Sequence, residues 1–327
     1  MEEKNDNLPK TLQQAIIFFA DPDVALKFMA ELRWPDGPIC PACESKEYSF
    51  ISTRRVWKCK ACKKQYTVKQ GTIMEDSALG LDKWLCAIWM IANDKNGISS
   101  YEIHRGIGIT QKSAWFLLHR IRLAMQTGTF QKLSGPVEAD ETFIGGKARN
   151  MHKDKRKAKI KGTGSSGKAI VMGILERHGE VRTKVVATRD RETVQNEIRN
   201  NVELGAEVYT DSFTSYQGLA PDYVHQVVNH AEEYVRGQIH TNSIENFWSL
   251  VKRALGGTYV SVMPFHLFRY LDEQSFRFNY RKLNDQQRFL IACASMDGRR
   301  LTYKKLIGET LMRDETIGRF RDTLFPL

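Results

Sequence analysis

The 327-residue sequence has no apolar run approaching the roughly 20 residues that a membrane-spanning helix needs. A signal peptide is also missing, since the N-terminal MEEKNDNLPKTLQQ is acidic and polar. We therefore expect a soluble protein that stays in the cytosol and does not associate with a membrane. Disulfides are rare in that compartment, so the six cysteines need another explanation.

Acidic side chains are in the minority. The chain has 38 Asp and Glu against 49 Lys and Arg, a formal net charge of +11 and a pI of about 9.3. This balance names no fold, but it favours an anionic partner, of which nucleic acid is the commonest. A ribosomal or otherwise non-specifically basic protein is the alternative. The 42% apolar content and the length are those of a globular protein with two or three domains.

Four of the cysteines form two closely spaced pairs, CPAC at 40–43 and CKAC at 59–62. Two C-x2-C turns separated by fifteen residues are typical of a four-thiolate zinc site. The flanking stretches are rich in β-formers, so we predict a zinc ribbon at 35–75, and two redox dithiols are the alternative. Cys86 and Cys293 lie in apolar helical stretches and are expected in the core. The predicted zinc ligands are Cys40, Cys43, Cys59 and Cys62.

Residues 81–126 follow helical patterns. LDKWLCAIWMIAND reads as one helix, and the residues from 99 to 125 read as a helix, a Gly-containing turn and a second helix capped by Thr110. This is the order of a helix-turn-helix, in which exposed residues early in the second helix meet DNA. Many helical hairpins bind nothing, but a basic ribbon upstream favours DNA binding. The candidate DNA contacts are Gln111, Lys112, Ser113 and Arg120.

The next segment alternates strands and helices. GPVEADETFIGGK predicts a strand with Val137 and Ala139 on one face and Glu138 and Asp140 on the other. KAIVMGILER and EVRTKVVATR predict a hairpin, followed by a helix over 190–203 and a strand that ends at Asp211 before a helix begins. This order predicts a mixed sheet flanked by helices, consistent with a ribonuclease-H-like core.

HTNSIENFWSLVKRA, at 240–254, predicts a helix with an apolar stripe and a polar face that carries Asn242, Glu245, Ser249 and Lys252. Three carboxylates from separate elements could hold two Mg²⁺ ions for phosphoryl transfer, and the candidates are Asp140, Asp211 and Glu245.

Several alternatives remain open for these residues. Asp211 could serve only as a helix N-cap, and Asn242 with Glu245 could form a capping box. Glu138 and Glu141 also compete with Asp140 for the catalytic position.

Together, these motifs resemble the DDE-type transposases of bacterial insertion sequences that carry an N-terminal zinc ribbon, the ISXO2-like transposase family. The matching stretches run in order from about residue 25 to residue 281 and cover most of the chain. They are CPAC…CKAC, GTIMEDSALGLDKW, KNGISSYEIHRGIGITQKSAWFLLHRIRLAM, VEADETFIGG, VYTDSFTSY, HTNSIENFWSLVKRALGGTYV and HLFRYLDEQSFRFNYR.

The resemblance implies a ribonuclease-H-like domain that uses Mg²⁺ or Mn²⁺, with Asp140 and Asp211 at the first two acidic positions. Glu245 stands seven residues before Lys252, which matches the family's third acid and the basic residue that follows it. Some members have Asn at the third position, so Asn242 is a second candidate ligand. Lys252 is expected near the scissile phosphate, or is a solvated lysine.

The resemblance also implies a function in transposition. The ribbon and helix-turn-helix would bind terminal inverted repeats, and the catalytic domain would cleave transposon ends and join them to target DNA. A homo-oligomer is expected for pairing two ends, in the bacterial cytoplasm at the nucleoid. The rival functions are a zinc-ribbon DNA-binding regulator, an inactive transposase-derived protein, and another ribonuclease-H-like nuclease or resolvase.

The stretch at 147–168 is crowded with Lys and Arg, which favours either a phosphate-binding loop or a solvated one. Its candidate DNA contacts are Lys155, Arg156 and Lys157. The expected organisation is a helical segment at 1–34, the zinc ribbon at 35–75, the helix-turn-helix at 78–130, the catalytic domain at 135–285 and a helical tail at 286–327.

Overall fold

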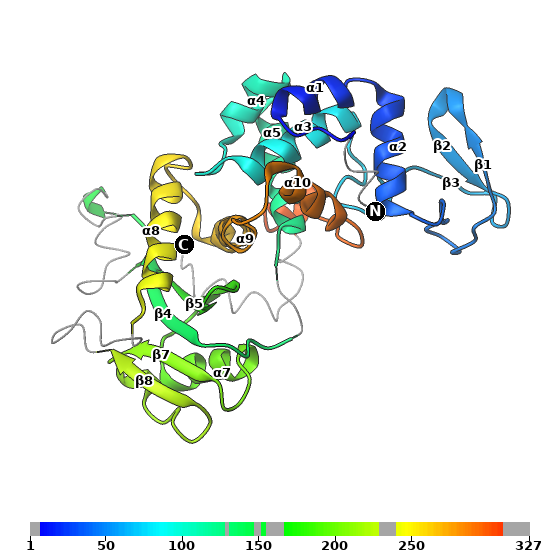
Figure 1. Ribbon diagram of the computed structural model, residues 1–327. Helices are drawn as coiled ribbons and strands as arrows, with labels where there is room; N and C mark the ends of the chain where they lie inside the picture. Colours follow the sequence, from blue (N-terminus) through cyan, green and yellow to red (C-terminus); the bar gives the residue numbers. More distant parts are fainter. Residues whose placement is uncertain (1–6, 128–130, 147–151, 155–166, 229–239, 310–327) are drawn as a thin grey trace. The chain divides into compact units, whose positions relative to one another are not determined.

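The computed structural model (Figure 1) describes residues 7–127, 131–146, 152–154, 167–228 and 240–309. The chain divides into two compact units. The terminal unit comprises Met1–Met125 and Tyr280–Leu327, and the central unit comprises Gln126–Asn279. Both units contain helices and sheet, which agrees with the mixed α/β class predicted from the patterns along the sequence.

Aromatic packing between helices from both ends of the sequence builds the core of the terminal unit. Phe19 lies 5.0 Å from Phe28 and 5.7 Å from Phe289 between ring centroids, and Trp89 lies 5.0 Å from Phe289. Helix α10 therefore completes a core that α1, α2 and α3 begin. The helices are α1 (Leu12–Phe19), α2 (Pro22–Arg33), α3 (Leu81–Asn93), α4 (Ser100–Ile107), α5 (Gln111–Ala124), α10 (Asp285–Ala294) and α11 (Tyr303–Leu306).

Local capping signals set the ends of α4 and α5, as predicted. Ser99 and Glu102 form a capping box at the start of α4. Gly108 ends that helix with φ of 68°, a left-handed conformation that costs glycine little. Thr110 then accepts from the Ser113 amide and starts α5.

A small antiparallel sheet, here the ribbon sheet, lies between α2 and α3 in sequence. Its strands are β1 (Tyr48–Ile51), β2 (Val56–Cys59) and β3 (Gln65–Tyr66), in the order β1-β2-β3. The ring centroid of Trp57 lies 5.2 Å from that of Trp34 and 6.1 Å from that of Tyr66. One aromatic cluster is a small core for a sheet of this size, so the sheet depends on further support.

The central unit is built on a five-stranded mixed sheet of order β6-β5-β4-β7-β8. Strands β4, β5 and β6 pair antiparallel, whereas β4, β7 and β8 pair parallel, which puts β4 in the middle. The elements are β4 (Val137–Ile144), β5 (Ala169–Glu176), β6 (Val181–Val186), α7 (Arg191–Asn201), β7 (Glu207–Asp211), β8 (Val224–Val228), α8 (Asn242–Gly257) and α9 (Leu267–Asn279).

Alternation along β4 sends successive side chains to two different cores. Val137 and Ala139 join the cluster that includes residues of α7. The opposite face of the sheet packs against α8 and α9, where Trp248 and Leu271 are buried. Helix α8, yellow in Figure 1, contacts both β4 and β5. The predicted division of the β4 side chains between two faces is confirmed.

Two details after β7 differ from the sequence-based expectation. The predicted helix is only a short 3-10 turn, Thr214–Tyr216, because Asp211 Oδ1 accepts from the Phe213 amide at 3.0 Å and directs the chain into a tight turn. The edge strand β8 was not predicted at all. Its sequence, VHQVV, does carry the β-branched residues that signal a strand.

Candidate metal centres and active site

The four predicted zinc ligands converge in the ribbon. Their sulfur atoms all lie within 4.8 Å of one another, with Cys40 and Cys62 3.7 Å apart and Cys43 and Cys59 3.6 Å apart. A tetrahedral site with Zn–S bonds of about 2.3 Å has sulfur–sulfur edges of about 3.8 Å, so the geometry fits zinc. Among the described residues, no other group of three or more His, Cys, Asp or Glu ligands gathers this closely.

The two cysteine turns share one backbone design. The Cys40 amide donates to Ser45 O at 3.0 Å, and the Cys59 amide donates to Lys64 O at 2.9 Å, five residues on in both cases. Glu44 and Lys63, the residues that follow each pair, both have positive φ, at 59° and 61°. The Cys62 amide donates to Cys59 Sγ. This hydrogen bond is the main cause that lowers the pKa of the Cys59 thiol to about 6. A lowered pKa favours the thiolate, which is the form that binds zinc.

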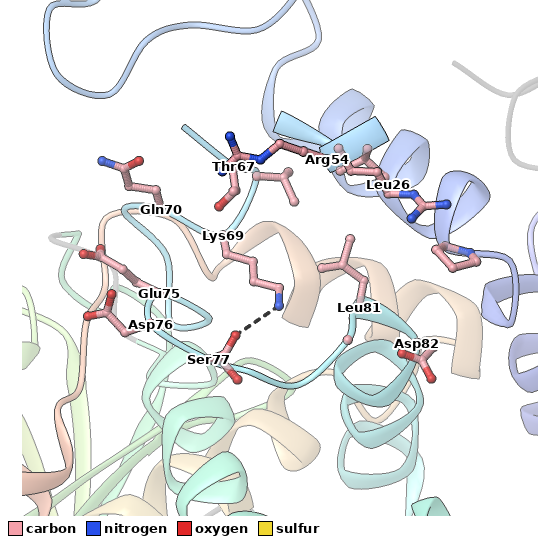
Figure 2. Close-up of a pocket in the computed structure, with 14 residues that line it drawn as sticks. Leu26, Arg54, Thr67, Lys69, Gln70, Glu75, Asp76, Ser77, Leu81 and Asp82 are labelled. Carbon is pink, nitrogen blue, oxygen red and sulfur yellow. Dashed lines mark hydrogen bonds between the residues drawn. The ribbon is translucent and has the colours of Figure 1, made fainter. Parts of the chain in front are cut away.

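A hollow of about 610 Å³ in the terminal unit is lined by residues of α2, of the ribbon and the segment after it, and of the start of α3. Figure 2 shows Lys69 reaching toward Ser77, whose backbone oxygen accepts from Nζ at 3.2 Å. The same Nζ also donates to Leu79 O. Burial lowers the pKa of Lys69. These contacts tie the segment after the ribbon to the start of α3, so Lys69 has a structural role here.

The three candidate catalytic acids lie on three elements of the central unit. Asp140 is in the middle of β4, Asp211 is the last residue of β7, and Glu245 is in the first turn of α8. Strands β4 and β7 are parallel neighbours, and Glu138 pairs with Tyr209. Asp140 and Asp211 each come two residues later, so this register places them side by side.

The surroundings of Asp140 are acidic, and its side chain is partly buried. Burial raises the pKa of Asp140 to about 6, and the charges of Asp211 and, to a smaller extent, Glu245 add to the effect. Trp248 acts in the opposite direction, since its Nε1 donates to Asp140 Oδ2 at 3.0 Å. Asp211 and Glu245 lie close enough to Asp140 for their charges to act on it, but the three carboxylates do not gather as closely as the four cysteine sulfurs.

A cleft of about 370 Å³ opens over this cluster. Asp140 lines it together with three residues of the predicted polar face of α8: Glu245, Ser249 and Lys252. Asp211 acts on Asp140 electrostatically but does not line the cleft. Asn242, the first residue of α8, is exposed and also lies outside the lining.

Glu138, a competitor of Asp140 in the sequence, has a different position. Its side chain is fully buried, and Oε2 accepts from the amides of Ser243 and Ile244 at 2.9 and 3.0 Å. The N-cap of α8 is Thr241, which makes no side-chain cap bond, so the capping box considered for Asn242 and Glu245 is not how this helix begins. The carboxylate of Glu138 satisfies the helix start instead.

Glu141 remains close to the cluster. Tyr216 Oη donates to Glu141 Oε1 at 2.5 Å, and Glu141 lines the same cleft as Asp140. Burial is the main cause that raises the pKa of Glu141 to about 7, with smaller contributions from the charges of Asp140 and Asp211. Sequence reasoning gave Glu141 no partner, because Tyr216 comes 75 residues later.

The candidate DNA contacts differ in exposure. Lys112 is exposed at the start of α5, Gln111 donates to Ser100 Oγ, and Ser113 pairs with Thr110. Arg120 differs from expectation, because it is only 6% exposed, stacks on Phe116 and donates to Leu301 O at 3.1 Å. That side chain contributes to packing. Lys155, Arg156 and Lys157 lie outside the described residues.

Comparison with known proteins identifies the class and then the family. The ISXO2-like transposase domain matches residues 132–279, and the transposase zinc-ribbon domain matches residues 21–65. Both are domains of transposases, which defines the class, and the ribbon match supports a structural zinc ion at the four cysteines. The chain belongs to the ISXO2-like transposase family, as its motifs predicted.

Two relatives agree with this assignment. An uncharacterized protein in transposable element ISH50 of Halobacterium salinarum is 28% identical over 244 residues, which are 71% of this chain and 82% of the relative. An uncharacterized transposase-like protein of Haemophilus influenzae is 32% identical over 108 residues, which are 33% of this chain and 87% of the relative. These similarities support an insertion-sequence transposase.

No helix among the described residues has the length and apolarity needed to cross a membrane.

Proposed function

We propose that this chain cleaves DNA at the ends of an insertion sequence and joins them to target DNA, with Mg²⁺ or Mn²⁺ held by Asp140, Asp211 and Glu245. The observation that carries the proposal is that Asp140 and Glu245 line one cleft, and that the charge of Asp211, from the neighbouring strand β7, also acts on Asp140. The strand order β6-β5-β4-β7-β8, with an antiparallel half and a parallel half, supports a ribonuclease-H-like catalytic domain.

The protein groups have separable tasks in this chemistry. Divalent ions bound to the acids would activate the attacking oxygen and stabilise the leaving oxygen of the phosphodiester. Trp248 orients the Asp140 carboxylate through Oδ2. Lys252 places a positive charge in the cleft, two helical turns beyond Glu245, where it is suited to contact phosphate. Because Asn242 does not line the cleft, Glu245 is the better third ligand.

Recognition of the inverted repeats belongs, in this proposal, to the ribbon and to α4 and α5 acting as a helix-turn-helix. Lys112 is exposed where the second helix of such a motif meets DNA, whereas Arg120 is too buried to do so. The net charge of +11 supports binding dominated by phosphate contacts, and therefore sensitive to salt. Pairing two ends would require at least two copies of the chain.

The decisive experiment compares Asp211→Asn with Asp222→Asn in the full chain. We expect Asp211→Asn to reduce end cleavage and joining by at least a hundredfold while leaving specific end binding intact. Asp222→Asn removes a carboxylate that pairs with Arg199 at 2.9 Å, outside the acidic cluster, and should keep its activity. If Asp211→Asn still joins DNA ends, the assignment is wrong. A wild-type chain that binds ends but never cleaves them would support the DNA-binding regulator instead.

A further inference from the structure

Glu138 is the most completely engaged carboxylate near the acidic cluster. Its Oε2 accepts two amide hydrogen bonds from the start of α8, and its Oε1 accepts from Arg177 Nε at 2.8 Å. His240 Nδ1 lies 3.5 Å from the same Oε1. With both oxygens occupied and no exposed surface, Glu138 is not placed to ligate a metal ion in the cleft.

Arg177 extends this contact to two more segments. Its Nη2 donates to His240 O at 2.7 Å, just before α8 begins. Its guanidinium lies 4.1 Å from the ring centroid of Tyr209, in β7, two residues before Asp211. The Glu138–Arg177 pair therefore touches each of the elements that carry the acids: β4, α8 and β7.

We propose that Glu138 is a positioning residue that sets where the start of α8 sits on β4, and thereby brings Glu245 into range of Asp140 for a shared divalent cation. This inference rests on the proposed function. Glu138 and Asp140 lie on the same face of β4, about 6.6 Å apart along the strand. Glu245 follows Ser243 and Ile244, whose amides Glu138 holds, by only one or two residues. One short strand segment thus fixes both carboxylates.

Burial of this ion pair is not explained by stability alone. Removing two charges from water is costly, and apolar side chains of similar volume often stabilise a core as well. A buried carboxylate that accepts from a helix start and from a guanidinium fixes the orientation of the helix relative to the strand, because each hydrogen bond constrains an angle as well as a distance. Mutation of residues that orient metal ligands without binding the metal themselves typically lowers metal affinity by about 10–100-fold.

Glutamine is the informative replacement at this position. Its amide oxygen can still accept from the start of α8, but its NH₂ group would then face Arg177 Nε, which is also a donor. The side-chain volume is kept while the hydrogen bond that joins Glu138 to Arg177 is lost. Glu176→Gln is the matched control, because Glu176 Oε1 also accepts from two backbone amides, those of Ser134 and Gly135, away from α8.

Direct cation binding to the full chain tests the inference without relying on catalysis. Tb³⁺ is a hard, oxygen-seeking ion whose luminescence is sensitised by a nearby tryptophan, and Trp248 contacts Asp140. The signal lost in Asp140→Asn defines binding at the acidic cluster. We expect Glu138→Gln to weaken that binding about tenfold, with competition by Mg²⁺ weakened in parallel, while Glu176→Gln keeps the wild-type affinity. Circular dichroism confirms that each variant is folded.

The outcomes separate this inference from the proposed function. Wild-type affinity in a folded Glu138→Gln, or an equal loss in Glu176→Gln, would overturn the positioning role alone. Absence of any Asp140-dependent Tb³⁺ signal in the wild type would overturn both proposals. Should Glu138→Gln fail to fold, Arg177→Lys tests the same link, because it keeps the charge but loses the bridge to His240 O. Unchanged affinity in that variant would also contradict the inference.

Discussion

At the scale of single residues, Asp140 is where burial and charge repulsion act together. Both disfavour its ionised form, and the pKa of Asp140 rises to about 6. The folded chain therefore holds this proton more tightly than the unfolded chain. Its contribution to stability is lost as pH rises from about 4 to about 6, and above that range the ionised carboxylate opposes folding in the absence of a cation.

Asp140→Asn should therefore stabilise the metal-free central unit. Each pKa unit corresponds to about 1.4 kcal/mol, so we expect a gain of roughly 2–3 kcal/mol at pH 7 and almost none at pH 4. Urea unfolding at both pH values measures the difference. An equal gain at the two pH values would show that the charge of Asp140 is not responsible.

Gly173 is a second residue whose identity the site depends on. It pairs with Asp140 across β4 and β5, and a Cβ there would lie 2.5 Å from Trp248 Cζ2. Gly173→Ala should push the indole away from Asp140 and cost about 1–3 kcal/mol of unfolding free energy.

Gly256→Ala in α8 is the control for Gly173→Ala, because a Cβ there meets nothing within 4 Å. It should raise stability by about 0.5–1 kcal/mol. Urea unfolding measures the stability of both variants, and Asp140-dependent cation binding should fall only in Gly173→Ala. A Gly173→Ala variant with wild-type stability would mean that Trp248 moves freely.

At the scale of elements, the ribbon sheet depends on its metal site more than on its core. Its strands are two to four residues long, and their buried side chains are only those of Trp57, Cys59 and Tyr66. Both cysteine turns place a residue with a side chain, Glu44 and Lys63, at positive φ, where L-residues are strained. Metal ligation is the interaction that can hold such turns together.

Cys59→Ser should release the bound zinc and unfold the ribbon sheet. Cys86→Ser provides the control, because Cys86 is buried in α3 and takes no part in the sulfur cluster. A chromogenic zinc assay on the purified chains should find one equivalent in the wild type and in Cys86→Ser, and none in Cys59→Ser. Retention of zinc by Cys59→Ser would contradict a four-thiolate site.

At the scale of the whole molecule, helices α1, α2 and α3 from the first hundred residues and α10 from the last fifty belong to one unit. Phe289 of α10 packs against Phe19, Phe28 and Trp89, which come 200 or more residues earlier. The central unit is therefore an insertion between two parts of the terminal unit. The aromatic cluster around Phe289 forms a core of the terminal unit, and two clusters, one on each face of the sheet, form the core of the central unit.

Phe289→Ala should destabilise the terminal unit by about 3–5 kcal/mol, as expected for a large cavity. Ile307→Ala, at an exposed position in the same C-terminal segment, should change stability little. Thermal unfolding followed by tryptophan fluorescence measures both variants. Since the central unit has a separate core, Asp140-dependent cation binding should survive in Phe289→Ala, and its loss would show that the two units do not fold independently.

The spacing of residues along the sequence was enough to predict the zinc ligands, the two faces of β4 and the ends of several helices. The paired cysteines, the alternation along β4, the caps of α4 and α5 and the polar face of α8 are all properties of neighbouring residues, which the sequence displays directly. Only the tertiary structure placed Glu138 at the start of α8, buried Arg120 against Leu301 and put Phe289 in the N-terminal core. Each of these depends on partners about 100 to 270 residues away, and side-chain patterns along a chain carry no information about which distant segment will pack against them.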